Sequence, residues 1–114
     1  VEVDLGENDV LLDAERVAGA PVIGTPPVIT GLTQVGQTVS TTSGIWDPAA
    51  ESYTYQWLRC DTAGNACQPI LGAVSQVYAL QEADRGTTLR VSVTGTNTNG
   101  SSAPAISAQT ATIT

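Results

Sequence analysis

Apolar and polar residues alternate along several short stretches of this chain, and the clearest stretch covers residues 53–59. Tyr53, Tyr55 and Trp57 fall on one face of an extended segment, and the intervening Thr and Gln fall on the other. This is the period-two pattern of a half-buried strand. The chain holds five aromatic residues, two Trp and three Tyr, and three of them lie here. We therefore expect the hydrophobic core to form around Trp57.

Turn residues divide most of the remaining chain into further short strands. Residues 87–97 form the longest alternating run, and residues 76–80 and 38–42 are shorter candidates. Residues 102–114 supply the last strand, whereas residues 45–52 are expected to form a loop with a Pro turn. About seven short strands separated by turns predict an all-β sandwich or barrel. Its expected core consists of Val39, Tyr55, Trp57, Tyr78, Leu80, Leu89, Val91 and Val93.

The first 20 residues differ in charge from the rest of the chain. They contain six acidic residues and one Arg, a net charge of −5, so the remaining residues carry only −2 of the total −7. Residues 18–27 are rich in Gly and Pro and are expected to form an extended linker. The sequence therefore predicts an acidic arm and linker over residues 1–25 and one β-domain over residues 26–114.

Apolar residues in the acidic arm leave its role open between two interpretations. They need a partner that buries their side chains, and they include Val1, Val3, Leu5, Val10, Leu11 and Leu12. In one interpretation, the arm is the end of a neighbouring domain followed by a linker. In the other, the arm adds as a strand to the sheet edge of an identical subunit. Residues 10–17 fit either a strand or a short amphipathic helix.

Cys60 and Cys67 are the only cysteines, and they flank a turn-forming segment centred on Ala-Gly-Asn. We expect them to form a disulfide that closes this hairpin; the alternative is two free thiols near a turn. A persistent disulfide predicts an oxidising compartment, outside the cell or at the cell surface.

The residue inventory excludes several classes of function. Histidine and lysine are absent, which removes Ser–His–Asp, Cys–His and Schiff-base chemistry. Two carboxylate pairs remain, Asp47 with Glu51 and Glu82 with Asp84, but turn and cap positions already account for them. We therefore expect no enzyme, no cofactor and no four-ligand zinc site. The acidic charge disfavours nucleic acid, and no apolar run approaches the length of a membrane span.

Two kinds of binding site are alternatives to a purely structural role. Acidic residues at positions 4, 7, 9 and 13 supply oxygen ligands at short spacing, but they do not form the calcium loop of an EF-hand, and a solvated arm is the simpler interpretation. Trp46, with Tyr53 as its neighbour, is a candidate platform for stacking against a glycan. The alternative is that Trp46 closes one end of the core.

Several motifs occur in the order found in immunoglobulin-like domains. They are Val-Gly-Gln-Thr at 35–38, Gly-Ile-Trp at 44–46, Tyr-Thr-Tyr-Gln-Trp-Leu-Arg-Cys at 53–60, Asp-Arg-Gly at 84–86 and Asn-Thr-Asn-Gly at 97–100. Over residues 26–114 the chain resembles the immunoglobulin-like repeats of secreted and surface bacterial proteins. The resemblance implies an antiparallel β-sandwich of about seven strands whose core is centred on Trp57.

The chain departs from antibody-type domains at two places. Val39 and Val91 stand where a disulfide would join the two sheets, so aliphatic packing is expected to close the core. Leu89 stands where a tyrosine would pin the preceding corner, and Asp84 is expected to cap that turn instead. The absence of lysine also excludes the Lys–Asn cross-link of pilin-type domains.

The resemblance implies a non-catalytic extracellular module that acts as a structural spacer or adhesion unit of a bacterial surface or secreted protein. Its partners would be neighbouring domains or identical subunits, with a protein or glycan ligand in the adhesive case. The alternative functions are a filament or pilus-like assembly subunit joined through its arm, and a decoration domain on a phage or virion surface.

Overall fold

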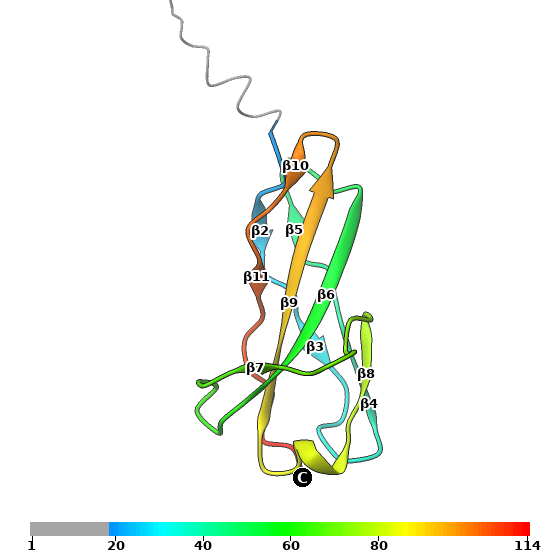
Figure 1. Cartoon of the computed structure of the whole chain (residues 1–114), viewed down its shortest axis with the longest axis vertical. Helices are drawn as coiled ribbons and strands as arrows, with labels where there is room; N and C mark the ends of the chain where they lie inside the picture. The colour runs from blue at the N-terminus through cyan, green and yellow to red at the C-terminus, as the bar shows by residue number, and fades with distance from the viewer. Residues whose placement is uncertain (1–18) are drawn as a thin grey trace, which may run out of the picture.

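A computed structural model describes residues 19–114, which form ten β-strands and one short 3₁₀ helix (Figure 1). All strand pairs are antiparallel. The predicted all-β class is therefore confirmed for this part of the chain. The acidic arm, with Val1, Val3, Leu5, Val10, Leu11 and Leu12, lies outside the described residues.

The largest sheet has five strands and is built on one long pairing. β6 and β9 pair antiparallel over nine positions, from Ser52 opposite Thr96 to Cys60 opposite Thr88. β7 joins the free side of β6, while β10 and β11 join the other side of β9. The strands are β6 (Ser52–Cys60), β7 (Gln68–Pro69), β9 (Thr88–Asn97), β10 (Gly100–Ser101) and β11 (Ala105–Ile106).

Two smaller sheets complete the fold. One contains β3 (Ile29–Thr30), β4 (Thr38–Thr41) and β8 (Val77–Ala79) in that order. The other pairs β2 (Ile23–Thr25) with β5 (Ile45–Trp46). The 3₁₀ helix η1 (Glu82–Asp84) joins β8 to β9 at the acidic corner seen in the sequence.

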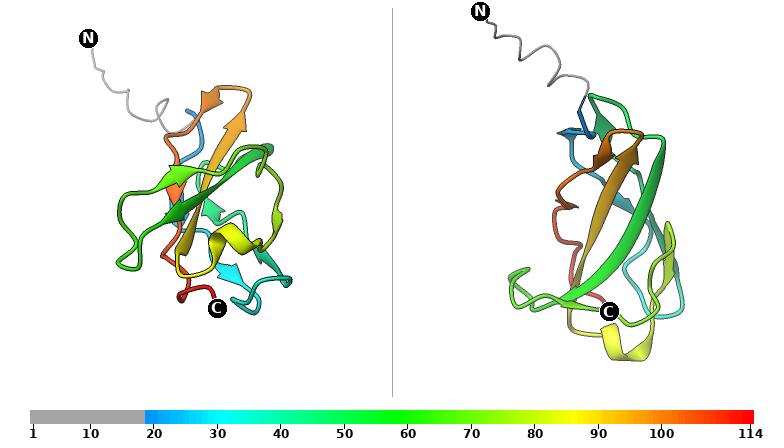
Figure 2. Two further views of the ribbon diagram at one scale, coloured as in Figure 1. Left: turned by 60° about the horizontal axis from the view of Figure 1, so that its bottom comes forward. Right: turned by 45° about the horizontal axis from the view of Figure 1, so that its top comes forward.

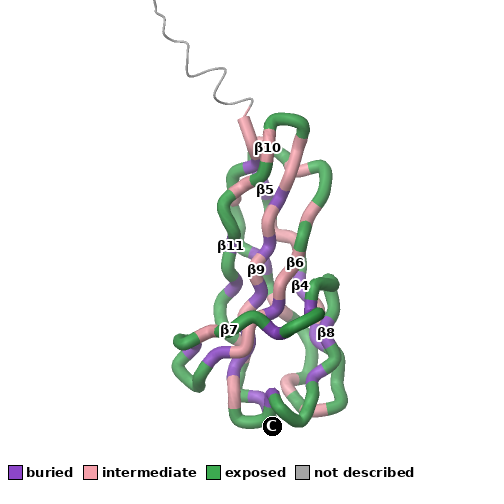
Figure 3. The backbone as a smooth tube through the Cα atoms, viewed as in Figure 1, coloured by how far each residue is buried: buried purple, intermediate pink, exposed green. Residues whose placement is uncertain are grey.

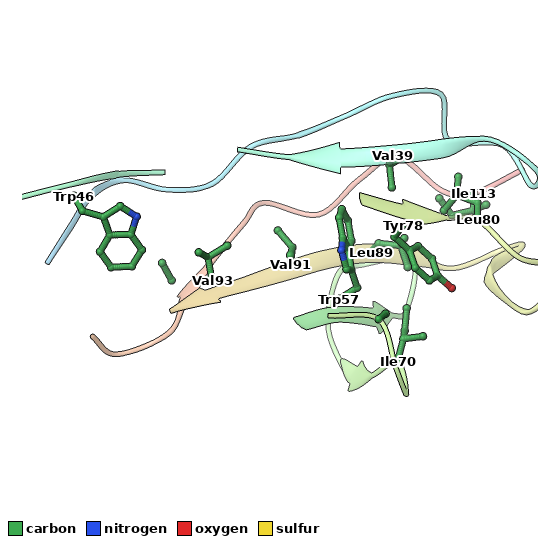
Figure 4. Close-up of a cluster of buried hydrophobic side chains, with 12 residues drawn as sticks. Val39, Trp46, Trp57, Ile70, Tyr78, Leu80, Leu89, Val91, Val93 and Ile113 are labelled. Carbon is green, nitrogen blue, oxygen red and sulfur yellow. The ribbon is translucent and has the colours of Figure 1, made fainter. Parts of the chain in front are cut away.

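Side chains of β6 and β9 face those of β4 and β8 across the core (Figure 4). Of the eight predicted core residues, Tyr55 is half-buried and packs against the cluster, whereas the other seven are buried. The buried positions follow the middle of β9 (Figure 3). The core also contains residues that local alternation did not identify, namely Trp46, Ile70, Ala73, Ala105 and Ile113.

β2 corrects the predicted domain boundary at residue 26. Ile23 pairs with Trp46, and both Pro21 and Pro27 are buried, so residues 21–27 belong to the fold and not to an extended linker. Gly and Pro disfavour a helix, but they are compatible with an irregular edge strand as well as with a linker. The partner strand β5 lies about 20 residues away, where the sequence pattern had predicted only a loop.

The C-terminal segment is less regular than the single strand predicted for residues 102–114. Beyond β10 and β11, three hydroxyl side chains take part in the pairing with β9. Ser102 Oγ, Ser107 Oγ and Thr110 Oγ1 accept the N–H groups of Gly95, Val91 and Leu89 at 3.1, 3.0 and 3.0 Å. The backbone N–H groups of the same three residues donate to the carbonyls of the same β9 residues. Hydroxyl groups thus replace backbone carbonyls at this edge of the sheet.

We expect Ser107→Ala to lower the free energy of unfolding by about 1–3 kcal/mol, because the buried N–H of Val91 loses its acceptor. Urea unfolding measures this change. The matched control is Ser101→Ala, which removes an exposed hydroxyl contact with Thr96 and should change stability little. Equal effects of the two substitutions would contradict a role for the Ser107 hydroxyl in the pairing.

Candidate functional site

Trp46 and Tyr53, the candidates for ligand stacking, lie against the core. Trp46 is only 7% exposed, and its ring centroid lies 6.3 Å from that of Tyr53. The Trp46 Nε1–H donates to the carbonyl of Ser43 at 2.7 Å. Trp46 therefore offers no free ring face to a glycan, which corrects the ligand-facing interpretation. It closes one end of the core instead (Figure 4).

Gly95 on β9 makes room for this packing. A Cβ atom at this position would lie 2.9 Å from the Cβ of Ala50 and 3.5 Å from the ring of Trp46. Sequence reasoning missed this role, although an isolated Gly inside a strand pattern is a recognised sign of close approach by another part of the chain.

Asp84 is the centre of a buried polar network at the opposite end of the core. Its fully buried carboxylate accepts hydrogen bonds from Arg59 Nε, the Tyr78 hydroxyl and the backbone N–H of Gln81, each at 2.8 Å. Three donors already occupy this carboxylate, and Glu82 is exposed and pairs with Arg85. The two carboxylates therefore do not form an acid–base pair.

Tyr78 supplies the hydroxyl that pins this corner. Asp84 is expected to cap the turn, and its hydrogen bond from the Gln81 N–H agrees with this. The sequence pattern does not predict that a tyrosine of β8 also bonds to Asp84. The Tyr78 ring stacks against Trp57 with centroids 5.8 Å apart. Burial, followed by the hydrogen bond to Asp84, raises the pKa of Tyr78 to about 12.

The Cys60–Cys67 disulfide is present and closes the hairpin between β6 and β7. This loop folds onto the outer side of the large sheet. Thr88 Oγ1 donates to the carbonyl of Asp61 at 2.6 Å, and Arg90 Nε donates to the carbonyl of Gly64 at 2.9 Å. Thr88 is consequently buried, although the alternation along residues 87–97 places it on the face opposite to the core residues Leu89, Val91 and Val93.

A shallow, uncharged groove with both polar and apolar surface lies between β8 and the loop that follows β7. Its volume is about 230 Å³, smaller than the roughly 300 Å³ at which small-molecule sites usually begin. None of its lining residues is charged; they are Ile70, Leu71, Gly72, Ala73, Val74, Ser75, Val77, Tyr78, Ala79 and Gln81. The groove therefore suits aliphatic side chains better than a cofactor.

β6 holds the outer wall of this groove in place. The backbone N–H of Trp57 donates to the carbonyl of Ala73 at 2.9 Å, and Trp57 Nε1 donates to the carbonyl of Ser75 at 2.8 Å. Gln56 Nε2 donates to the carbonyl of Ile70 at 2.9 Å. The side chains of Leu71, Val74 and Val77 are nevertheless exposed.

Other sites considered from the sequence find no place in the described region. Within residues 19–114, no group of three His, Cys, Asp or Glu side chains is arranged to hold a metal ion. The same region contains no helix long and apolar enough to cross a membrane. The acidic residues at positions 4, 7, 9 and 13 lie outside it.

Comparison with known proteins adds no family assignment. No protein-family model matches the chain, and a search of curated proteins finds no significant match. The resemblance to bacterial immunoglobulin-like repeats stays a prediction that rests on the motifs given above.

The Asp84 network predicts unequal effects for two neighbouring carboxylates. Asp84→Asn should lower the free energy of unfolding by about 3 kcal/mol, because it breaks a buried pair with Arg59. Glu82→Gln removes an exposed partner of Arg85 and should leave stability unchanged. Urea unfolding at pH 7 tests both variants. Equal stability of Asp84→Asn and the unaltered chain would show that the network is dispensable.

The raised pKa of Tyr78 predicts a loss of stability in alkaline solution. An unperturbed phenol titrates near pH 10, whereas the pKa of Tyr78 is about 12 in the folded protein. The folded state binds the Tyr78 proton more tightly than the unfolded state does. The stabilisation from the protonated hydroxyl is therefore complete below pH 10 and is lost as the pH rises to 12. The loss is roughly 2–3 kcal/mol.

Chemical unfolding between pH 9 and 12, roughly the window set by these values, measures this dependence. The stability of Tyr78→Phe should decline less over the same interval, and its remaining slope reports Tyr55, whose pKa is also raised by burial. A slope identical to that of the unaltered chain would rule out Tyr78 as its source.

Proposed function

We propose that this chain is a non-catalytic, immunoglobulin-like β-sandwich module of an exported bacterial protein, acting outside the cell as a structural spacer or adhesion unit. Two sheets that face each other across a core centred on Trp57 support the sandwich assignment. The Cys60–Cys67 disulfide supports an oxidising location. The bacterial origin rests on the sequence resemblance alone.

The positions of the two ends of the described chain support the spacer proposal. Residue 19 lies at one pole of the long axis and the C-terminus lies at the other (Figures 1 and 2). The described fold is longer along β6 and β9 than it is wide (Figure 1). A module that is elongated in this way and connected at opposite poles holds its neighbours apart instead of side by side.

Hydrogen bonds tie the chain to the fold at both poles. At the first pole, Asp47 N–H donates to the carbonyl of Val22 at 2.9 Å, and Asn97 Nδ2 donates to the carbonyl of Gly19 at 3.1 Å. At the other pole, Val35 N–H donates to the carbonyl of Thr114 at 2.9 Å. Tension between the poles would pass from β2 through β5 to β6, and from the C-terminal segment to β9, so the nine-position ladder of β6 and β9 lies in its path.

The charged groups support a structural role. The buried carboxylate of Asp84 already accepts three hydrogen bonds, and Arg90 bonds the backbone carbonyls of Gly64 and Ser107. These side chains stabilise loops and edges.

Stretching the full chain by its ends tests the spacer proposal. We expect one cooperative rupture, because β6 and β9 form a single pairing. Residues 19–114 span about 340 Å when extended. The nine-position ladder of β6 and β9 and the turns at its ends give a folded length of roughly 40 Å, and the disulfide withholds about 20 Å, so the oxidised chain should release about 280 Å. Single-molecule force spectroscopy measures this length.

Reduction of the disulfide provides an internal control. It should lengthen the release by about 20 Å, and the double variant Cys60→Ser with Cys67→Ser should give the longer release without reductant. Gradual extension without a rupture would reject a role in transmitting force.

A further inference from the structure

The groove beside β8 borders a strand edge that no other strand of residues 19–114 covers, although the N–H of Val77 on this edge donates to Ser75 Oγ at 3.4 Å. β8 is the terminal strand of the order β3–β4–β8. Gln76 and Leu80 direct their backbone bonds toward β4, through Thr41 N–H to the Gln76 carbonyl and Leu80 N–H to the Gln37 carbonyl. In an antiparallel ladder the intervening residues Val77 and Ala79 turn their backbone groups the other way. Such an edge is a template for a further strand.

The groove also exposes apolar surface without charge. Val74 is 60% exposed and Val77 is 50% exposed, and Leu71 extends fully into solvent. All three line the groove, whose volume is too small for most small-molecule ligands. An extended segment with aliphatic side chains would pair its backbone with the strand edge and pack its side chains against the exposed apolar residues.

The first 18 residues contain a segment with these properties. Val10, Leu11 and Leu12 form an uncharged run between Asp9 and Asp13. In an extended segment Val10 and Leu12 point to one side and Leu11 to the other. Two aliphatic side chains would then enter the groove, while the flanking carboxylates stay in solvent.

The positions of the poles favour docking between copies. The described chain begins at the pole near β10, where Asn97 Nδ2 bonds the carbonyl of Gly19, whereas β8, which lines the groove, lies toward the C-terminal pole (Figure 1). The net charge of the first 20 residues is −5, and the β5–β6 connection at the same pole as residue 19 carries Asp47 and Glu51. The half of the fold that contains the groove holds Arg59, Arg85 and Arg90 together with Asp61, Glu82 and Asp84, so its net charge is zero and it repels an acidic arm less than the pole of residue 19 does.

We propose that residues 10–12 of one copy occupy the groove of a second copy and add as an extended strand beside β8. The donor surface and the acceptor surface differ, so the contact is heterologous and propagates head to tail unless it closes into a ring. This joint goes beyond the spacer role and does not depend on it. A chain that fails to associate would still give the rupture described above.

Sedimentation velocity of the full chain over a concentration series tests the joint. The unaltered chain should exceed the monomer mass as its concentration rises. Val74→Asp and Leu12→Asp should each weaken association about tenfold or more, because they place a carboxylate in the apolar contact. Thermal melting of each variant confirms that it is folded.

Two matched substitutions serve as controls. Leu11→Asp alters the arm on the side facing away from the groove. Ile106→Asp alters an exposed apolar residue, 45% exposed, on β11 at the opposite edge of the molecule (Figure 1). Both variants should associate like the unaltered chain.

Four results would overturn the proposal. They are a monomer at every concentration, unchanged association of Val74→Asp or Leu12→Asp, loss of association with Leu11→Asp, and loss of association with Ile106→Asp. A monomer whose melting temperature falls equally in Val74→Asp and Leu12→Asp would mean that the segment docks within its own chain.

Discussion

The nine-position pairing of β6 with β9 organises the whole molecule, because both ends of the core are built on it. At its centre Trp57 lies opposite Val91 and both side chains are buried. At one end Tyr53 lies opposite Gly95, whose missing side chain admits Trp46. At the other end β6 carries Arg59, which reaches Asp84 in the corner before β9.

Polar interactions stabilise segments of the fold that the small hydrophobic core does not hold. With five aromatic residues and no Phe or Met, the chain has few large side chains for its interior. Trp57 therefore has two roles: its ring fills the core, while its N–H groups hold the loop that ends near Ser75. The Asp84 network, the hydroxyl groups of the C-terminal segment and the disulfide loop likewise fix segments whose backbone pairing is short.

The two edges of the fold differ in how they are covered, and this difference bears on the proposed joint. The edge beside β9 is covered by the C-terminal segment. The disulfide loop also contacts this segment, because Gln109 Nε2 donates to the carbonyl of Thr62 at 3.2 Å. The edge at β8 has no such cover among residues 19–114, and apolar side chains surround it. A module with one protected edge and one open edge can join copies in a single direction, as the proposed joint requires.

The sequence by itself determined the elements whose side chains alternate between core and solvent. Alternating side chains predicted β6 from residues 53–59 and β9 from residues 87–97. Each strand has one buried face, and the resulting pattern is local in the sequence. The Cys pair and the acidic corner were equally local signals. Tertiary structure alone decided features that depend on distant partners: the pairing of β2 with β5, the burial of Trp46 over Gly95, and the covering of Thr88 by the disulfide loop. These contacts join residues about 20 to 50 positions apart, where no local period records which segments meet.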